Sequence, residues 1–147
     1  MKLESHVTEA IQKIQAEAED RMKEAVIEVR NHTIDKLSEP GKGRIYENYF
    51  FTDGSGQLQR GRKRNKPHQA SAPGDAPTTD EGQLKQSIKW TLETSGREIT
   101  GKVGTDKEYG AMLEFGTSKI LPRPWLQKSF DESKDEVIAI FNKPMEL

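Results

Sequence analysis

The chain has 147 residues, of which 32% are hydrophobic and 32% charged, and its mean hydropathy is −0.87. This length and composition fit one domain with a modest core. Its net charge of −1 and pI near 6.3 exclude a strong overall attraction to nucleic acid or membranes, and the absence of cysteine excludes disulfides, thiol nucleophiles and Cys-ligated zinc. No apolar run is long enough for a membrane span, and none follows the N-terminal lysine as in a signal peptide, so we expect a soluble protein of a reducing compartment.

The first predicted element is a long amphipathic helix from about Glu4 to Leu37, ended by the "SEPGKG" stretch around Pro40. At 1.5 Å per residue it would be roughly 50 Å long, more than a small domain needs. We therefore expect one end to project or to pack on a neighbouring subunit. Its apolar residues recur at three- and four-residue steps: Val7, Ile11, Ile14, Ala18, Met22, Val26, Val29, Ile34 and Leu37.

An aromatic segment follows, "RIYENYFFT" from Arg44, which is typical of a strand. The turn signal "DGSG" at 53–56 and the sequence "QLQRG" predict a returning strand. Because Leu58 is the only large apolar residue between Thr52 and Pro67, we expect a mobile aromatic and basic hairpin or loop over about 47–67.

Five positive charges fall within seven residues at 60–66, and the tyrosines and phenylalanines before them could stack on bases. Such side chains could contact phosphates in a salt-dependent, sequence-independent way. The alternative is a solvated loop, because the rest of the chain carries an acidic excess. The candidate contact residues for DNA or for the lumen of a ring are Arg60, Arg62, Lys63, Arg64 and Lys66.

The segment "HQASAPGDAPTTDEGQL" at 68–84 is rich in proline and glycine. We expect an extended arm over 68–78, with a type II turn at Ala72 to Asp75. Fixed proline φ angles make such an arm cheap to order on an adjacent subunit, and the alternative is a plain loop. A capping box from Thr78 to Glu81 is expected to open a short helix containing Leu84.

The C-terminal half predicts a hairpin and two further helices. "KWTLET" and "REITGKVGT" alternate around Ser95-Gly96, which would point Trp90, Leu92, Ile99 and Val103 at a core. A second capping box at Thr105–Glu108 should open a short helix ending at a left-handed Gly116. A last helix begins near Pro122 and Pro124, ends at Pro144, and is expected to bury Leu126, Phe130, Val137 and Phe141.

These elements indicate one α+β domain over 1–147, with a long N-terminal helix, a small antiparallel β-sheet with hairpins, short helices and a C-terminal helix packed on the sheet. Catalysis is not expected. His68, Ser71 and Asp75 share one loop without an orienting scaffold, the three histidines lack ligand spacing, and no phosphate-binding loop ends in Gly-Lys-Ser/Thr. No cofactor or metal is expected either.

Two motifs taken together resemble the tail-completion, or head–tail joining, family of long-tailed bacteriophages, of the lambda-like minor tail protein Z type. The stretch 68–84 matches the proline-rich segment that precedes a short helix in that family, and "YGAMLEFGTSKILPRPWL" from Tyr109 matches the segment after its hairpin. Asp75, Gly110 and Trp125 stand where glutamate, alanine and phenylalanine are usual, and the insertion over 47–66 is longer than the family pattern.

The resemblance implies a structural virion protein of the neck, assembled in the host cytoplasm, with no membrane and no catalysis. Its expected partners are copies of itself in a ring of six or twelve subunits, a tail terminator or tail tube protein, and a head-completion or stopper protein, with DNA in the lumen. A nucleic-acid-binding protein that uses the basic loop is the competing function. The resemblance places the subunit or ring interface at His68, Gln69, Pro73, Gly74, Asp75, Pro77, Glu114, Phe115, Gly116, Arg123 and Trp125.

Overall fold

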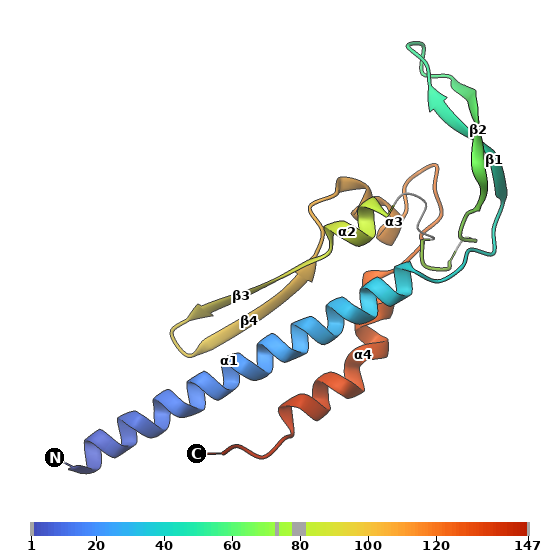
Figure 1. The fold of residues 1–147 in the computed structure, drawn as a ribbon. Coiled ribbons are helices and arrows are strands. Elements are labelled where there is room, and N and C mark those ends of the chain that lie inside the picture. The colour runs from blue at the N-terminus through green and yellow to red at the C-terminus, as the bar shows by residue number, and fades with distance from the viewer. Residues whose placement is uncertain (1, 73, 78–81, 147) are drawn as a thin grey trace.

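The structure, a computed structural model, describes residues 2–72, 74–77 and 82–146 and confirms the α+β class. A long helix carries a β-hairpin and a second helix along its length, and another hairpin stands away from them at its C-terminal end (Figure 1). The elements in chain order are α1 (Lys2–Leu37), β1 (Ile45–Thr52), β2 (Leu58–Gln69), α2 (Gln83–Ser87), β3 (Lys89–Ser95), β4 (Glu98–Gly104), α3 (Glu108–Phe115) and α4 (Leu126–Phe141).

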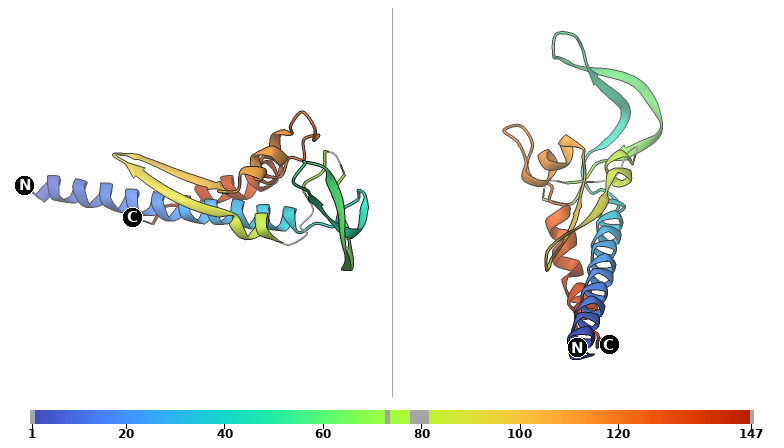
Figure 2. Two further views of the ribbon diagram at one scale, coloured as in Figure 1. Left: turned by 90° about the horizontal axis from the view of Figure 1, so that it is seen from above. Right: turned by 90° about the vertical axis from the view of Figure 1, so that its left-hand side faces the viewer.

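α1 is covered only over its C-terminal half. There Val26, Val29 and Leu37 are at most 7% exposed, whereas residues 6–14 are all exposed and include Val7 and Ile11 at 51% each. The N-terminal end extends beyond the tip of the β3–β4 hairpin in Figure 1 and in the view from above (Figure 2). The prediction of a projecting helix end is therefore confirmed.

α4 lies along α1 and packs against it through small side chains rather than through its aromatic stripe. Ser129 and Ser133 are fully buried and Ile140 is 6% exposed, so the two helices approach closely. The predicted burial of Phe130 and Phe141 is wrong, because their side chains are 43% and 39% exposed. The sequence pattern counted apolar residues and gave no weight to serines, whose small volume allows the contact.

The predicted hairpin is formed by β3 and β4, with its turn at Gly96-Arg97 rather than Ser95-Gly96, and it lies on another side of α1. Its register pairs Trp90 with Val103 and Leu92 with Gly101, which places these side chains on one half-buried face. A Cβ at Gly101 would lie 2.4 Å from Cγ1 of Val26, so glycine permits the close approach of hairpin and helix.

The hydrophobic core forms where α1, α2 and the start of α4 meet. It consists of Leu37, Leu84, Ile88 and Trp125, with Leu113 and others packed on its edge. Trp125 donates a hydrogen bond from Nε1 to the carbonyl oxygen of Gly110, 2.9 Å away, so its buried polar atom is satisfied. This core is small, in keeping with the composition.

Neither α2 nor α3 has a side-chain hydrogen bond from its N-cap residue. The Thr78–Glu81 box lies outside the described residues, and α2 begins at Gln83 with Gly82 as N-cap. At α3 the N-cap is Lys107, and the hydroxyl of Thr105 instead accepts a hydrogen bond from the Lys107 N–H, 3.0 Å away. A threonine that bonds two residues ahead forms a local turn, which competes with the capping arrangement.

Strands β1 and β2 form a separate antiparallel hairpin in which the whole basic run is extended strand. The register shifts twice, between Tyr46 and Asn48 and between Asn48 and Phe50, so β2 bulges relative to β1. Of the two forms expected for residues 47–67, hairpin or loop, the structure shows the hairpin.

Candidate functional site

An apolar groove of about 870 Å³ lies between α1, β4 and α4. Its floor is the middle of α1, including Met22 and Val26, and its walls are β4 and α4, with Phe130 and Phe141 on the α4 side. The end of α3 closes it with Phe115, which is 79% exposed. Large exposed apolar patches mark interaction sites, so this groove is the first candidate surface for assembly.

The groove explains why the aromatic stripe of α4 is not buried. Phe130, Val137 and Phe141 all line it, whereas the serines on the neighbouring face of the helix meet α1. Sequence reasoning identified these aromatic residues but assigned them to the core. Helical periodicity reports which residues share a face and cannot tell whether the surface opposite belongs to the same subunit.

The second candidate surface is the β1–β2 hairpin, here defined as residues 42–69 with the chain that leads into it. This hairpin carries seven lysine and arginine residues and two acidic residues, whereas the rest of the chain carries 16 basic and 22 acidic residues. It projects away from the helices in all three views (Figures 1 and 2). The near-neutral net charge thus hides two oppositely charged parts.

Contacts within the hairpin hold part of the basic run. The guanidinium carbons of Arg62 and Arg64 lie 4.6 and 4.2 Å from the centre of the Tyr49 ring. Arg60 donates to Oδ1 of Asn48 at 3.1 Å. Lys63, which pairs with Asn48 in the register, and Lys66 are exposed. The five predicted contact residues therefore lie on one ordered strand, where arginine–tyrosine stacking fixes two of them.

Asp53 organises the tip of this hairpin. Its Oδ1 accepts hydrogen bonds from the N–H and hydroxyl of Ser55 and from the N–H of Gln57, and its Oδ2 accepts one from Gln59. The Ser55 hydroxyl is the main reason that the pKa of Asp53 falls to about 2, followed by Gln59 and Gln57. The tip between the strands is thus a defined turn.

The proline- and glycine-rich segment contacts its own subunit. The N–H of Asp75 donates to the carbonyl oxygen of Ala72 at 3.1 Å, and Gly74 has a φ of 86°, as the predicted type II turn requires. Gly74 also donates to the carbonyl oxygen of Pro122, and Pro77 is buried. Pro73 lies outside the described residues. These contacts describe the loop alternative, and contact of the segment with an adjacent subunit stays a prediction.

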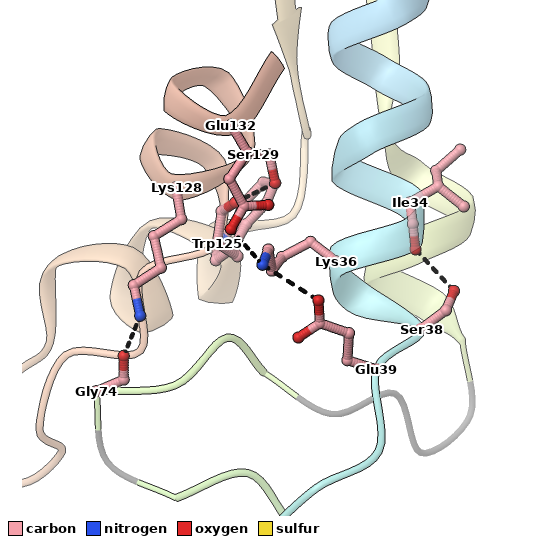
Figure 3. Close-up of polar contacts among 9 residues, drawn as sticks. All are labelled: Ile34, Lys36, Ser38, Glu39, Gly74, Trp125, Lys128, Ser129 and Glu132. Atoms are coloured by element: carbon pink, nitrogen blue, oxygen red, sulfur yellow. Dashed lines mark hydrogen bonds and ion pairs between the residues drawn. The ribbon is translucent and has the colours of Figure 1, made fainter. Parts of the chain in front are cut away.

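A polar junction joins this segment to α1 and α4 (Figure 3). Lys36 bridges Glu132 at 2.6 Å and Glu39 at 3.1 Å, and Lys128 donates to the carbonyl oxygen of Gly74. The hydrogen bond that Lys36 donates to the Glu132 carboxylate is the main cause that raises the pKa of Lys36 above its ordinary value. The junction connects the start of α4 to the loop and borders a cavity of about 390 Å³, which Lys36, Lys128 and Glu132 help to line.

The beginning of the segment belongs to β2. His68 pairs with Tyr46 and Gln69 with Ile45 in the hairpin register, and Gln69 also donates from Nε2 to the carbonyl oxygen of Gly43. The expected arm over 68–78 therefore starts in a strand. Its first two residues are held by backbone pairing within the subunit.

Glu114 and Trp125, two of the predicted interface residues, have roles inside the subunit. The Glu114 carboxylate accepts hydrogen bonds from the N–H groups of Trp125, Leu126 and Gln127 at 2.7, 2.8 and 3.1 Å, so it caps α4. Trp125 is 2% exposed. The ring is enclosed by the core of its own subunit, and a role for Trp125 in an interface stays a prediction.

Arg123 and Gly116 shape the connection between α3 and α4. Arg123 donates from its backbone N–H to the carbonyl oxygen of Leu113 and from Nη1 to the hydroxyl of Ser71, while its Nε has no partner among the described residues. Gly116 has a positive φ of 74°, as predicted, but a ψ of 175°, which lies outside the left-handed helical region. Phe115 beside it is exposed and stays a candidate for contact with a partner.

Within residues 2–72, 74–77 and 82–146, no group of three or more His, Asp or Glu side chains could hold a metal ion. The half-buried His32 has two carboxylates near its Nε2, Glu28 of the same helix at 3.4 Å and Glu136 of α4 at 3.8 Å. Over the same part of the chain, no helix is long and apolar enough to cross a membrane.

Comparison with known protein families identifies the family to which the chain belongs. Residues 2–116 match the HK97-gp10-like family model, which is described as "Bacteriophage HK97-gp10, putative tail-component". The match covers most of the chain, so the protein belongs to this family of phage tail components, a tail-associated structural part of the virion. No match was found among curated proteins, and none among solved structures. The expected resemblance is confirmed at this level, and the lambda-like type stays a prediction.

Proposed function

We propose that this chain is a ring subunit of the phage neck, which completes the tail and joins it to the DNA-filled head. Its membership of a family of tail components supports the location, and the open groove supports the assembly. The proposed partners are copies of itself, a tail terminator or tail tube protein on one side, and a head-completion or stopper protein on the other. The role is structural, without catalysis or a cofactor.

The groove is the observation that carries this proposal. A subunit whose core contains only a few fully buried side chains leaves about 870 Å³ of mostly apolar space open beside them. Burial of such surface is worth about 25 cal/mol per Å² of apolar area, so a partner that fills it adds substantially to a modest core. Ring subunits are completed by their neighbours in this way.

A stop codon at Gln12 in the phage gene tests the proposal. Electron microscopy of the lysate is expected to show DNA-filled heads and separate, unattached tails, and a plasmid copy of the intact gene should restore joined virions. Normal virions from the mutant without the plasmid would refute a joining role. Heads without DNA would place the defect earlier in assembly and would also count against it.

Direct contact with nucleic acid is a second candidate function, favoured by the charge of the β1–β2 hairpin. Such contact would depend strongly on salt, because each neutralised phosphate releases counterions. The variant in which Arg60, Arg62, Lys63 and Arg64 are changed to serine separates the two functions. Retention of duplex DNA at low and high salt should fall in the variant if the hairpin binds DNA, and should be unchanged if it does not.

A further inference from the structure

Two unsatisfied surfaces of this chain are complementary in hydrophobicity. The groove exposes Phe130 and Phe141 on its α4 wall and Phe115 at its end. The hairpin exposes Ile45 at 59%, Phe51 at 56% and other apolar side chains that nothing in the described chain covers. One surface is concave and the other is a narrow projecting ribbon (Figure 1).

The register shows which hairpin side chains act together. Phe50 pairs with Arg60 and Thr52 pairs with Leu58, and directly opposed residues place their side chains on the same face. One face of the ribbon therefore presents Phe50 at 41% exposure and Leu58 at 70%, with Arg60 beside them. An apolar tip with an arginine at its rim fits a groove with apolar walls in a subunit body whose net charge is negative.

Charge distinguishes the hairpin from another exposed apolar element that could fill the groove, the stripe of Val7, Ile11 and Ile14 on α1. Residues 4–20 around that stripe contain five acidic residues and one lysine, and α4 contains four acidic residues and two lysines. The stripe would bring negative charge to a subunit body that is itself acidic. The hairpin, with seven basic and two acidic residues, brings the opposite charge.

The size of the groove suits the hairpin tip. A volume of about 870 Å³ falls in the range of about 300–1,000 Å³ in which proteins enclose whole ligands, so it can receive several apolar side chains together. The hairpin stands off the C-terminal end of α1, away from the groove of its own subunit (Figure 2). The two surfaces are therefore available to different copies.

We infer that the β1–β2 hairpin of one copy docks in the apolar groove of the next. Leu58 and Phe50 enter beside Phe130, and the basic strand meets a subunit body in which acidic residues outnumber basic ones. Because the two surfaces differ, the contact is head-to-tail and repeats from copy to copy, which generates a ring when the rotation closes. The inference deepens the proposed function and rests on it, since it names the contact that would build the neck ring.

Cysteine cross-linking tests this contact, because the chain contains no cysteine of its own. The double variant Leu58→Cys with Phe130→Cys is treated with a short bismaleimide, both as concentrated full-length protein and in particles assembled when it complements the Gln12 stop mutant. We expect a ladder of covalent dimers, trimers and higher multimers on a denaturing gel. Each single variant should remain monomeric, because a head-to-tail contact never places two identical positions together.

The matched control keeps Leu58→Cys and moves the second cysteine to Asp135→Cys. Asp135 is exposed on α4 and lies roughly 140° around the helix from Phe130 at 3.6 residues per turn, on the side away from the groove. A ladder as strong in this control would overturn the proposal, as would the absence of multimers from both samples. Dimers from a single variant would show a symmetric contact and overturn it as well.

Nucleic acid is tested in the same variants. If duplex DNA, rather than a second copy, shields the Leu58→Cys thiol from a maleimide, the hairpin is a nucleic-acid-binding element and the inference falls. The cross-linking result and the phenotype of the stop mutant together test the contact and the neck role separately. Unjoined heads and tails without a ladder would leave the neck role standing, whereas a ladder in purified protein with normal virions from the stop mutant would refute the neck role alone.

Discussion

Replacement of Glu114 by alanine should destabilise the isolated subunit. Its carboxylate accepts hydrogen bonds from three successive N–H groups at the start of α4, the longest of them 3.1 Å, and no described side chain closer in sequence caps this helix. Alanine would leave these donors without their acceptor and remove a negative charge from the positive end of the helix dipole.

The expected loss can be worked from these contacts. Removal of a single N-cap acceptor costs about 0.5–2 kcal/mol, and a carboxylate at a partly buried helix N-terminus contributes up to about 2 kcal/mol. The capping hydrogen bonds and the charge at the helix end are both contributions of the Glu114 carboxylate and overlap, so we expect the free energy of unfolding to fall by about 2 kcal/mol in total. For a chain of this size, each kcal/mol shifts the melting temperature by about 2–4 °C, which gives a decrease of about 4–8 °C.

Urea or thermal unfolding followed by circular dichroism measures this loss. Asp135→Ala is the matched control, because it removes an exposed carboxylate from the same helix away from its N-terminus and should change stability by less than about 0.5 kcal/mol. Equal stability of Glu114→Ala and the control would refute the capping role. It would return Glu114 to the interface role that the sequence indicated.

Three further outcomes are expected. Trp125→Phe should cost about 1–3 kcal/mol in chemical unfolding, because it deletes a buried hydrogen bond, whereas Phe115→Ser, at a 79% exposed site, should stay within about 0.5 kcal/mol. Ser133→Leu should cost about 1–3 kcal/mol by overpacking the fully buried contact between α4 and α1. The tip of the β1–β2 hairpin should be ordered above about pH 4 and loosen as the pH falls through the Asp53 pKa of about 2, because a carboxyl group with a lowered pKa stabilises the fold only while it is ionised. Amide exchange at Ser55, corrected for intrinsic rates, should therefore be slower at pH 5 than at pH 2, and Asp53→Asn should remove this difference.

The candidate surfaces were only partly predictable. The basic run was read from the sequence as a contact element, but its strand form depends on pairing with β1 and on the stacking of Arg62 and Arg64 on Tyr49. Trp125 sits in a motif that resembles the family's, and a motif match cannot distinguish a residue retained for packing from one retained for contact. The groove was missed because no single element forms it.

The sequence by itself determined the elements with strong local signals. The period of α1, the proline that follows it, the alternation of the β3–β4 hairpin and the α+β class all arise from interactions between near neighbours, so they could be read directly. The tertiary structure alone decided which faces are covered. Ser129 and Ser133 are buried and Phe130 is open because two helices approach closely at small side chains, a contact between residues about 100 positions apart that no local pattern contains.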